Sequence, residues 1–263
     1  MQHATFFPVV TDSLLPYIDS FSYVSFDSND SLLVPPLGFP VILFCFSPHN
    51  SFYTHNEFKN ESVVVGQMTR YIKINPSPNT KLFGINFKPY GFYNLFQVSL
   101  AAYQDGGLGL NQLFSEQDIV TIYDQLANDA PINDIIASVE QIILKYQHPV
   151  STPSFFDPLV DRMVKSNGII HPYHLLPCSS LTKSFQRYFT KTIGISPKKF
   201  CSIYRHKFIL KLKYDTVNLS WNDIVFDGSY YDYSHFYRDF KKFTTQHPFS
   251  FPFDNQDFVR KLI

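Results

Sequence analysis

Apolar residues follow two different periods along the chain. Through about the first hundred residues, short apolar or alternating runs at 41–46, 62–65, 71–74 and 81–88 are separated by clusters of Pro, Gly, Asn and Ser. Runs of this length between turn-forming residues predict β-strands. We therefore expect this stretch to form a small antiparallel barrel or sandwich.

Beyond these runs the period lengthens toward that of a helix. Residues 115–126 predict a helix capped by Ser115, and residues 131–146 predict a longer helix with Pro131 in its first turn. The apolar positions of the longer helix fall close to a heptad seam, so Pro131–Tyr146 could pair with its copy in a homodimer. The same face could instead pack on its own barrel, and two heptads do not separate the two arrangements.

A domain boundary is predicted near residue 150. Residues 147–154 contain two prolines among small polar residues and lack an apolar period, which is typical of a linker. Residues 1–153 hold 6 Lys and Arg against 13 Asp and Glu, a net charge of −7, and residues 154–263 hold 16 against 9, a net charge of +7. We expect an N-terminal part, residues 1–150, and a C-terminal part, residues 151–263, of which only the second meets a polyanion.

Residues 219–251 predict two short helices joined by a tight turn. Ser220 can cap the first helix, and Asp223 completes an approximate capping box. Gly228 and Ser229 break the helical pattern, and glycine tolerates the left-handed backbone that ends a helix. The segment is therefore predicted to be a helix-turn-helix unit.

The second of these helices has an apolar inner face and a basic outer face. Phe236, Phe240 and Phe243 recur at helical spacing, which predicts one buried stripe. Asp232 or Ser234 can cap the helix. The outer face is aromatic and cationic, and it carries Tyr233, His235, Tyr237, Arg238, Lys241 and Lys242. A helix with such a surface, held by a second helix at a turn, fits the major groove of DNA.

Residues 224–248 read I-V-x-x-x-S-Y-Y-D-Y-S-H-F-x-R-D-F-K-K-F-T-x-x-x-P, which resembles the second helix-turn-helix of AraC-type transcription regulators. Val225, Ser229 and Thr245 stand where that family usually has Ala, the turn Gly and a later Gly, so the turn could shift by one residue. The resemblance implies DNA binding and is carried by Asp232, Ser234, His235, Phe236, Arg238, Phe240, Lys241 and Pro248.

A first unit of the same kind is predicted upstream. Leu181, Phe185 and Phe189 form a buried stripe, and the opposite face carries Thr182, Lys183, Gln186 and Thr190, flanked by Arg187 and Lys191. The stretch F-Q-R-Y-F-x-x-x-x-G-I-S-P-K-K-F resembles the first AraC-type unit. Pro177 is expected to end the supporting helix early, because proline lacks the backbone N–H.

Residues 198–214 predict a long helix that connects the two units. Arg205, within it, stands where the AraC-type family usually has an Arg. We favour a structural salt bridge for this residue over a contact with a DNA phosphate.

The candidate DNA contacts divide into base readers and phosphate contacts. An Arg pairs with guanine, and Ser or His with several base edges, whereas Lys241 and Lys242 are expected to neutralise phosphates. Arg238 could read a base or lock against Asp223 or Asp227. Tyr230 and His235 are expected to be core or turn residues. The candidate DNA-binding residues are Thr182, Lys183, Gln186, Arg187, Tyr233, Ser234, Tyr237, Arg238, Lys241 and Lys242.

The N-terminal part also contains familiar stretches. L-P-Y-I-D-S-F at 15–21, P-P-L-G-F-P at 35–40, G-Q at 66–67 and G-I-N-F-K-P-Y-G-F-Y-N-L-F at 84–96 resemble a cupin-like domain attached to some AraC-type regulators. The resemblance implies that this part senses a small-molecule effector or dimerises.

Other chemistry is weakly represented. His49, His55 and Glu57 lie in a polar, loop-like stretch, which makes a cupin-type metal site improbable. Cys45, Cys178 and Cys201 are too far apart for a disulfide framework or a zinc knuckle. The N-terminus has no signal-peptide pattern, and no apolar run is long enough to cross a bilayer. We expect a cytoplasmic protein without a cofactor, a metal or contact with a membrane, and not an enzyme.

Taken together, the patterns predict an α+β protein: a β barrel or sandwich with following helices, then an all-α domain with two helix-turn-helix units. The predicted function is sequence-specific binding of double-stranded DNA in transcription regulation, responsive to a ligand. Two alternatives remain at this point. One is a ligand-sensing or interaction module with degenerate DNA binding, and the other is a metal-dependent cupin enzyme.

Overall fold

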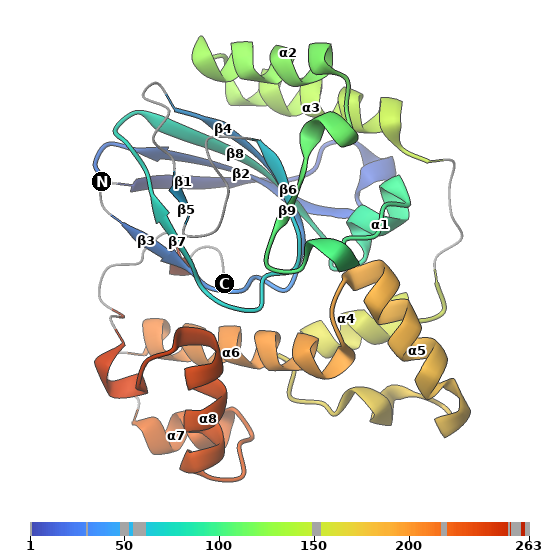
Figure 1. Ribbon diagram of the computed structural model, residues 1–263, viewed down its shortest axis with the longest axis vertical. Helices are drawn as coiled ribbons and strands as arrows, with labels where there is room; N and C mark the ends of the chain where they lie inside the picture. The colour runs from blue at the N-terminus through green and yellow to red at the C-terminus, as the bar shows by residue number, and fades with distance from the viewer. Residues whose placement is uncertain are drawn as a thin grey trace.

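The computed structural model describes residues 2–29, 31–47, 53–54, 62–148, 154–216, 220–251, 253 and 259–260. The fold is α+β, as predicted: strands dominate the N-terminal part, and the described residues from 154 onward form helices and turns (Figure 1). The helices α2 (Glu116–Ala127) and α3 (Ile132–Tyr146) lie on one side of the strands, and the helices of the C-terminal part lie on the other.

The described strands form two antiparallel sheets. The larger has the order β1-β2-β8-β4-β6-β9 and consists of Gln2–Phe7, Ile18–Phe26, Thr80–Phe87, Val41–Phe46, Val63–Val65 and Gly107–Gly109. The smaller has the order β3-β7-β5 and consists of Leu32–Val34, Ile72–Asn75 and Tyr53–Thr54. The predicted runs at 41–46, 62–65, 71–74 and 81–88 are confirmed as strands to within about two residues.

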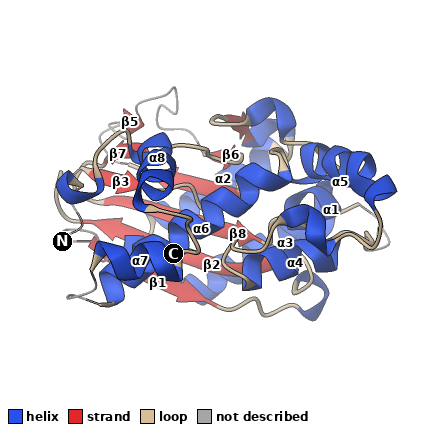
Figure 2. Ribbon diagram, turned by 90° about the horizontal axis from the view of Figure 1, so that it is seen from below, coloured by secondary structure: helices blue, strands red, loops and turns tan. Residues whose placement is uncertain are grey.

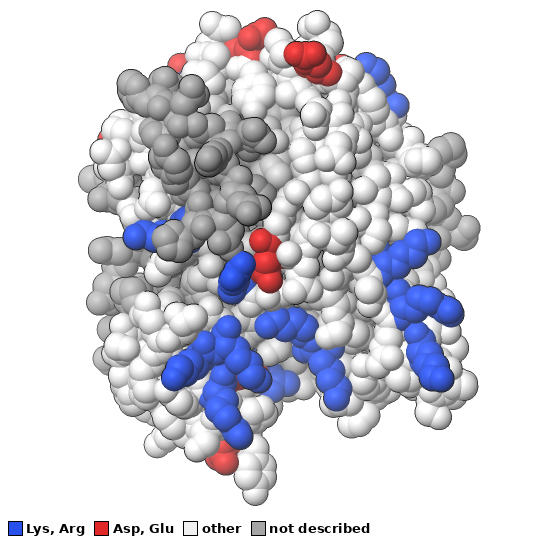
Figure 3. Space-filling model, viewed as in Figure 1, with Lys and Arg blue, Asp and Glu red and all other residues white. Residues whose placement is uncertain are grey.

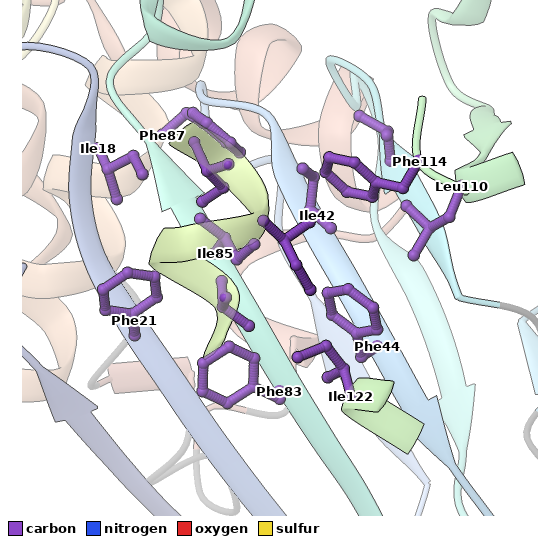
Figure 4. Close-up of a cluster of buried hydrophobic side chains, with 14 of the residues drawn as sticks. Ile18, Phe21, Ile42, Phe44, Phe83, Ile85, Phe87, Leu110, Phe114 and Ile122 are labelled. Carbon is purple, nitrogen blue, oxygen red and sulfur yellow. The ribbon is translucent and has the colours of Figure 1, made fainter. Parts of the chain in front are cut away.

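The central strand β8 is buried on both faces. Phe83 and Ile85 point into the core beneath α2 and α3 (Figure 4), whereas Leu82, on the opposite face, packs in a second cluster between the sheets. Its neighbours β2 and β4 pair with it along most of its length. A strand covered on both sides loses the alternation of polar and apolar residues, which is why Gly84 and Asn86 are also buried.

Helix α3 packs on its own chain. The predicted seam residues Ile135, Ile136, Val139 and Ile143 are at most 4% exposed and belong to the same core as the sheet and α2. The seam of Pro131–Tyr146 therefore packs within its own chain, which favours the second of the two arrangements, and the homodimer contact stays a prediction. Pro131 itself lies just before the helix, as its N-cap, rather than in the first turn.

The C-terminal part consists of α4 (Asp157–Lys165), α5 (Thr182–Tyr188), α6 (Pro197–Asp215), α7 (Trp221–Asp227) and α8 (Tyr233–Thr244). Helix α6, predicted as the connector, spans two apolar clusters. Its first half supplies Phe200 and Ile203 to the cluster around α5, and its second half supplies Ile209 and Leu210 to the cluster around α8. One rigid helix thus fixes the spacing of the two units.

The two parts of the chain are packed together. The hydroxyl of Tyr90 donates to Asp161 of α4 at 3.1 Å, and the hydroxyl of Tyr71 lies 2.9 Å from Nε2 of His206 in α6. Figure 2 views the same arrangement from below and shows α6 running beneath the large sheet. The predicted boundary near residue 150 falls in 149–153, outside the described residues, so the domain division stays a prediction.

Candidate nucleic-acid interface

The unit formed by α7 and α8 begins with the predicted cap. The hydroxyl of Ser220 accepts from the backbone N–H of Asp223 at 3.2 Å, and the Asp223 carboxylate accepts from the backbone N–H of Ser220 at 3.2 Å. This reciprocal capping box satisfies two backbone donors that would otherwise have no partner at the helix start. The sequence prediction for this cap is confirmed.

The turn between α7 and α8 differs from the prediction in one residue. Gly228 has an ordinary φ of −72°, and Ser229 takes the left-handed conformation with φ of 51°. Gly228 is required for space instead, because a Cβ there would lie 2.7 Å from Cδ1 of Ile209 and 2.9 Å from the Tyr230 ring. The left-handed residue is therefore the Ser that stands at the usual position of the turn Gly.

Helix α8 is capped and buried as expected. The Asp232 carboxylate accepts from the backbone N–H of His235 at 2.7 Å, so Asp232 rather than Ser234 is the N-cap. Phe236, Phe240 and Phe243 are at most 2% exposed. Their burial orients the helix and leaves its opposite face toward solvent.

The outer face of α8 is basic. Ser234, Arg238, Lys241 and Lys242 are exposed. Arg238 donates from Nε to the backbone carbonyl of Ser234 at 3.2 Å. Its hydrogen-bond partner is thus a carbonyl of α8 and not the carboxylate of Asp223 or Asp227. The side chain is exposed, and a guanidinium can pair with an acceptor in a bidentate way.

Two other residues of this face have partners within the unit. Tyr237 is half-buried, with its ring 4.8 Å from that of His247, and Lys242 pairs with Asp239 at 3.0 Å. The Asp239 carboxylate is buried, whereas the Lys242 side chain is 65% exposed, so the Lys242 ammonium can also approach a phosphate.

Tyr233 is only partly accessible. Its hydroxyl is buried without a hydrogen-bond partner among the described residues, and its ring stacks on that of Phe249 at 6.3 Å. Burial raises the pKa of this phenol. Tyr233 was expected on the outer surface, but it is half-buried and its hydroxyl is covered, and its role in DNA binding stays a prediction.

The predicted inward residues of this unit are confirmed. Tyr230 is 8% exposed, and His235 is half-buried with its ring 5.2 Å from that of Tyr230. Arg205 of α6 lies over the same Tyr230 ring at 5.2 Å and donates to the backbone carbonyl of Gly168 at 3.2 Å. Arg205 is thus structural, as favoured, but its contacts are a ring and a carbonyl rather than a carboxylate.

The first unit is held by aromatic packing around α5. Phe185 and Phe189 are fully buried, and Leu181 is half-buried. The opposite face leaves Lys183, Gln186 and Arg187 exposed, whereas Thr182 at the helix start is half-buried.

The segment before α5 forms only short 3₁₀ turns, in place of the supporting helix of a helix-turn-helix unit. Pro172–Leu175 forms one 3₁₀ turn, and a second 3₁₀ turn at Ser179–Leu181 leads directly into α5. Pro177 lies between these turns and supplies no N–H, which agrees with the predicted early end. This unit is therefore less regular than the one formed by α7 and α8.

Gln186 is already engaged in this unit. Its side-chain amide donates to the hydroxyl of Tyr173 at 2.8 Å, and the Lys198 ammonium lies 5.8 Å from the centre of the same Tyr173 ring. Sequence analysis did not single out Tyr173. No periodicity signals it, because the contact joins a 3₁₀ turn to a helix thirteen residues away.

The end of α5 contacts the N-terminal part. A π-helical turn at Phe189–Ile193 follows α5, and Gly194 then adopts a φ of 93°. The hydroxyl of Ser99 donates to the backbone carbonyl of Lys191 at 2.7 Å, and the Lys191 ammonium lies 5.3 Å from the centre of the Tyr93 ring. These contacts couple the position of α5 to the N-terminal part.

Basic side chains gather over the helices of the C-terminal part. Figure 3 shows Lys and Arg mainly in the lower half of the molecule, whereas acidic groups lie at its upper edge and at a few places in the middle and lower part. The exposed basic residues on α5, the π-helical turn after it, α6 and α8 are Lys183, Arg187, Lys191, Lys198, Lys211, Arg238, Lys241 and Lys242. Such a surface attracts a polyanion.

The structure adds little on metals and membranes. His49, His55 and Glu57 lie outside the described residues. Within the described ranges, no group of three or more His, Cys, Asp or Glu side chains is arranged to hold a metal ion. Among those same residues, no helix has both the length and the apolar character needed to cross a bilayer.

Comparison with known proteins gives limited matches. Residues 11–108 match a family described as a domain of unknown function, DUF6597, over less than half of the chain. No curated protein matches the chain.

Several solved structures of ToxT from Vibrio cholerae are similar in outline. A form from strain O395 is 10% identical with a TM-score of 0.43, covering 94% of this chain and 95% of that one. A wild-type form bound to an unsaturated fatty acid is 13% identical with a TM-score of 0.43, covering 94% and 93%. TM-scores below 0.5 are too low to assign a family or an activity.

Proposed function

We propose that this chain is a sequence-specific DNA-binding transcription regulator that responds to a small-molecule effector. The observation that carries the proposal is the pair of units on α6. Each has a buried aromatic stripe, Phe185 and Phe189 in one and Phe236 and Phe240 in the other, with a polar and basic face on the opposite side. The resemblance of both segments to AraC-type units supports the same function.

In this proposal α8 enters a major groove of double-stranded DNA. Arg238 reads a guanine edge, Ser234 and Tyr237 contact neighbouring bases, and Lys241 and Lys242 neutralise phosphates. Tyr233 contributes by packing under the helix, since its hydroxyl is covered.

Helix α5 occupies the next major-groove turn, about 34 Å along the same face of the duplex. Gln186 and Thr182 are the proposed base contacts, whereas Lys183 and Arg187 lie on the exposed side where phosphates would approach. Because both units are built on α6, the DNA sites for α5 and α8 should keep a fixed separation.

A selection from random duplexes with the full chain tests the proposal. We expect enrichment of a motif with two conserved elements about one helical turn, roughly 10 base pairs, apart. The variant Arg238→Ala/Lys241→Ala should lose the element read by α8, and Lys73→Ala, an exposed lysine on β7, should select the wild-type motif. Absence of any enriched motif would count against DNA binding.

One observation favours a second function, a ligand-sensing module with degenerate DNA binding. The support of α5 is a 3₁₀ turn, and the end of α5 is tied to the N-terminal part through Ser99 and Lys191. Enrichment of a single short motif that depends on Arg238 but not on Gln186 would indicate that only the α8 unit reads DNA.

A further inference from the structure

A cavity of about 480 Å³ opens between the two parts of the chain. One wall comes from β1, β2, the loop before β4 and the end of β8, and the other comes from α4 and α6. The expected place for an effector was the N-terminal barrel itself. The space between the two sheets is instead filled by apolar side chains such as Phe26, Leu32 and Leu82. The space between the large sheet and α2 and α3 is likewise filled, by side chains such as Phe83 and Ile85 (Figure 4).

Lys207 of α6 lies in the wall of this cavity and is only 8% exposed. Its ammonium donates to the backbone carbonyl of Leu37 at 3.0 Å and lies 4.9 Å and 5.0 Å from the ring centres of Phe39 and Tyr204. All of these contacts are with neutral groups, and no carboxylate of the described residues lies within ion-pair distance. A buried cation without a counter-ion is costly, and burial accordingly lowers the pKa of Lys207.

The charged groups in the remaining wall leave the cavity positive. Lys88 and Lys211 line it together with Lys207, and neither forms an ion pair with a described residue. Asp19 and Asp161 also line it, but Asp161 already accepts from the Tyr90 hydroxyl. Among the described lining residues, cations therefore outnumber carboxylates by three to two.

The rest of the wall suits the body of an organic molecule. Phe6, Phe39 and Phe87 supply apolar surface, and Ser20 and Asn86 supply polar groups beside it. A volume of this size and a mixture of aromatic surface with a few polar groups are typical of small-molecule sites.

We propose that this cavity binds a small organic anion, a carboxylate or a phosphate monoester on a flat apolar body, with its anionic group facing Lys207 and Lys211. The aromatic wall accepts the body of the ligand. Since Lys207 and Lys211 belong to α6, such a ligand bridges the N-terminal part and the helix that carries both proposed DNA-binding units. Binding of the anion does not depend on whether the chain binds DNA.

Calorimetric titration of the full chain, without DNA, tests the site. The probes are benzoate, phenyl phosphate and the neutral benzyl alcohol. We expect saturable binding of benzoate, phenyl phosphate or both at one site per chain, and at least about tenfold weaker binding of benzyl alcohol. The two anionic probes distinguish a carboxylate ligand from a phosphate ligand.

Three variants locate the site. Lys207→Met should weaken the anion that binds by about tenfold or more. Lys211→Gln, at the exposed edge where folding is not at risk, should weaken it severalfold. Lys165→Gln, an exposed residue of α4 outside the cavity wall, should bind as wild type. Failure of both anions to bind, equal binding of benzyl alcohol, or unchanged affinity in Lys211→Gln and folded Lys207→Met would overturn the proposal.

Discussion

The side-chain amide of Gln186 donates a 2.8 Å hydrogen bond to the hydroxyl of Tyr173. The bond connects the exposed face of α5 to the 3₁₀ turn at Pro172–Leu175. This turn takes the place of the longer supporting helix of a regular helix-turn-helix unit. The orientation of the amide is thus set before any DNA arrives. An amide fixed in this way pays less conformational entropy when it pairs with a base edge.

Removing the hydroxyl tests this relationship. Tyr173→Phe keeps the ring against Phe185 and deletes only the acceptor of Gln186. Discrimination at the base contacted by Gln186 should fall by about 1 kcal/mol, the usual net worth of such a hydrogen bond. Competition binding to a selected duplex and its single-base variants measures the loss.

Lys183→Ala is the matched control on the same helix. It should weaken all duplexes by a similar factor, because a phosphate contact carries no sequence information. If Tyr173→Phe also weakened all duplexes equally, Gln186 would not be a base reader.

The turn before α8 offers a pair of opposite stability changes. Ser229→Gly should stabilise the chain by about 0.5–1 kcal/mol, because a Ser at positive φ is strained and Gly is not. Gly228→Ala should destabilise it by about 1–3 kcal/mol, since the new Cβ meets Ile209 and Tyr230. Urea denaturation of both variants measures the difference. Destabilisation by Ser229→Gly would contradict the left-handed assignment of Ser229, and stabilisation by Gly228→Ala would contradict the crowding at Gly228.

The N-cap of α8 should matter through its oxygen rather than its charge. Asp232→Ala should destabilise the chain by about 1 kcal/mol, because the backbone N–H of His235 loses its acceptor. Asp232→Asn retains a side-chain oxygen and should change stability by only a few tenths of that. Thermal unfolding followed by circular dichroism separates the two. An equal loss in both variants would indicate an ion pair instead of a cap.

Helix α3 should affect stability and not assembly. Ile136→Ala should destabilise the chain by about 2–4 kcal/mol, because Ile136 is 4% exposed in the core shared with the sheet. In analytical ultracentrifugation, the variant should have the same mass as the wild-type protein. Gln141→Ala, on the exposed side of α3, is the control and should change neither. A shift in mass with unchanged stability would instead support the homodimer contact.

Anion binding in the cavity should weaken as the pH rises. Burial lowers the pKa of Lys207 to about 8, with Asp19 opposing the shift and Lys211 adding to it. Below that pH the ammonium is charged and attracts the anion, and above it the charge is lost. The other charged or titratable groups lining the cavity are Asp19, Asp161, Lys88, Lys211 and Tyr204.

Calorimetry with benzoate or phenyl phosphate between about pH 7 and about pH 9 measures this dependence, a range that spans the lowered pKa. Lys211→Gln retains Lys207 and should retain the dependence at lower affinity. An affinity that does not change across this range would exclude Lys207 as the charged partner.

The features that sequence alone predicted are local ones. The caps at Ser220 and Asp232 and the stripe of Phe236, Phe240 and Phe243 depend on residues within one or two turns, so spacing reveals them. The long connector α6 was predicted for the same reason. Its apolar residues recur at helical spacing over many turns.

The features that sequence did not predict depend on contacts between distant segments. The turn before α8 needs a residue without a Cβ at position 228, because Ile209 of another helix lies there, and the left-handed residue is Ser229. The surface against which the apolar face of α3 packs is formed by strands that lie far away in the chain. In the wall of the cavity, Lys207 contacts the backbone carbonyl of Leu37, which lies 170 residues earlier in the chain. A contact over this distance cannot be predicted from periodicity.

Salt titration of DNA binding tests the central claim most directly. Binding of the full chain to its selected duplex and to a scrambled duplex is measured by fluorescence anisotropy over a range of salt concentrations. We expect the selected duplex to bind at least about 10³-fold more tightly, with affinity falling steeply as salt rises. Lys241→Ala should reduce the slope of log affinity against log salt by about 1 on both duplexes. Equal affinity for the two duplexes, or binding insensitive to salt, would contradict the account.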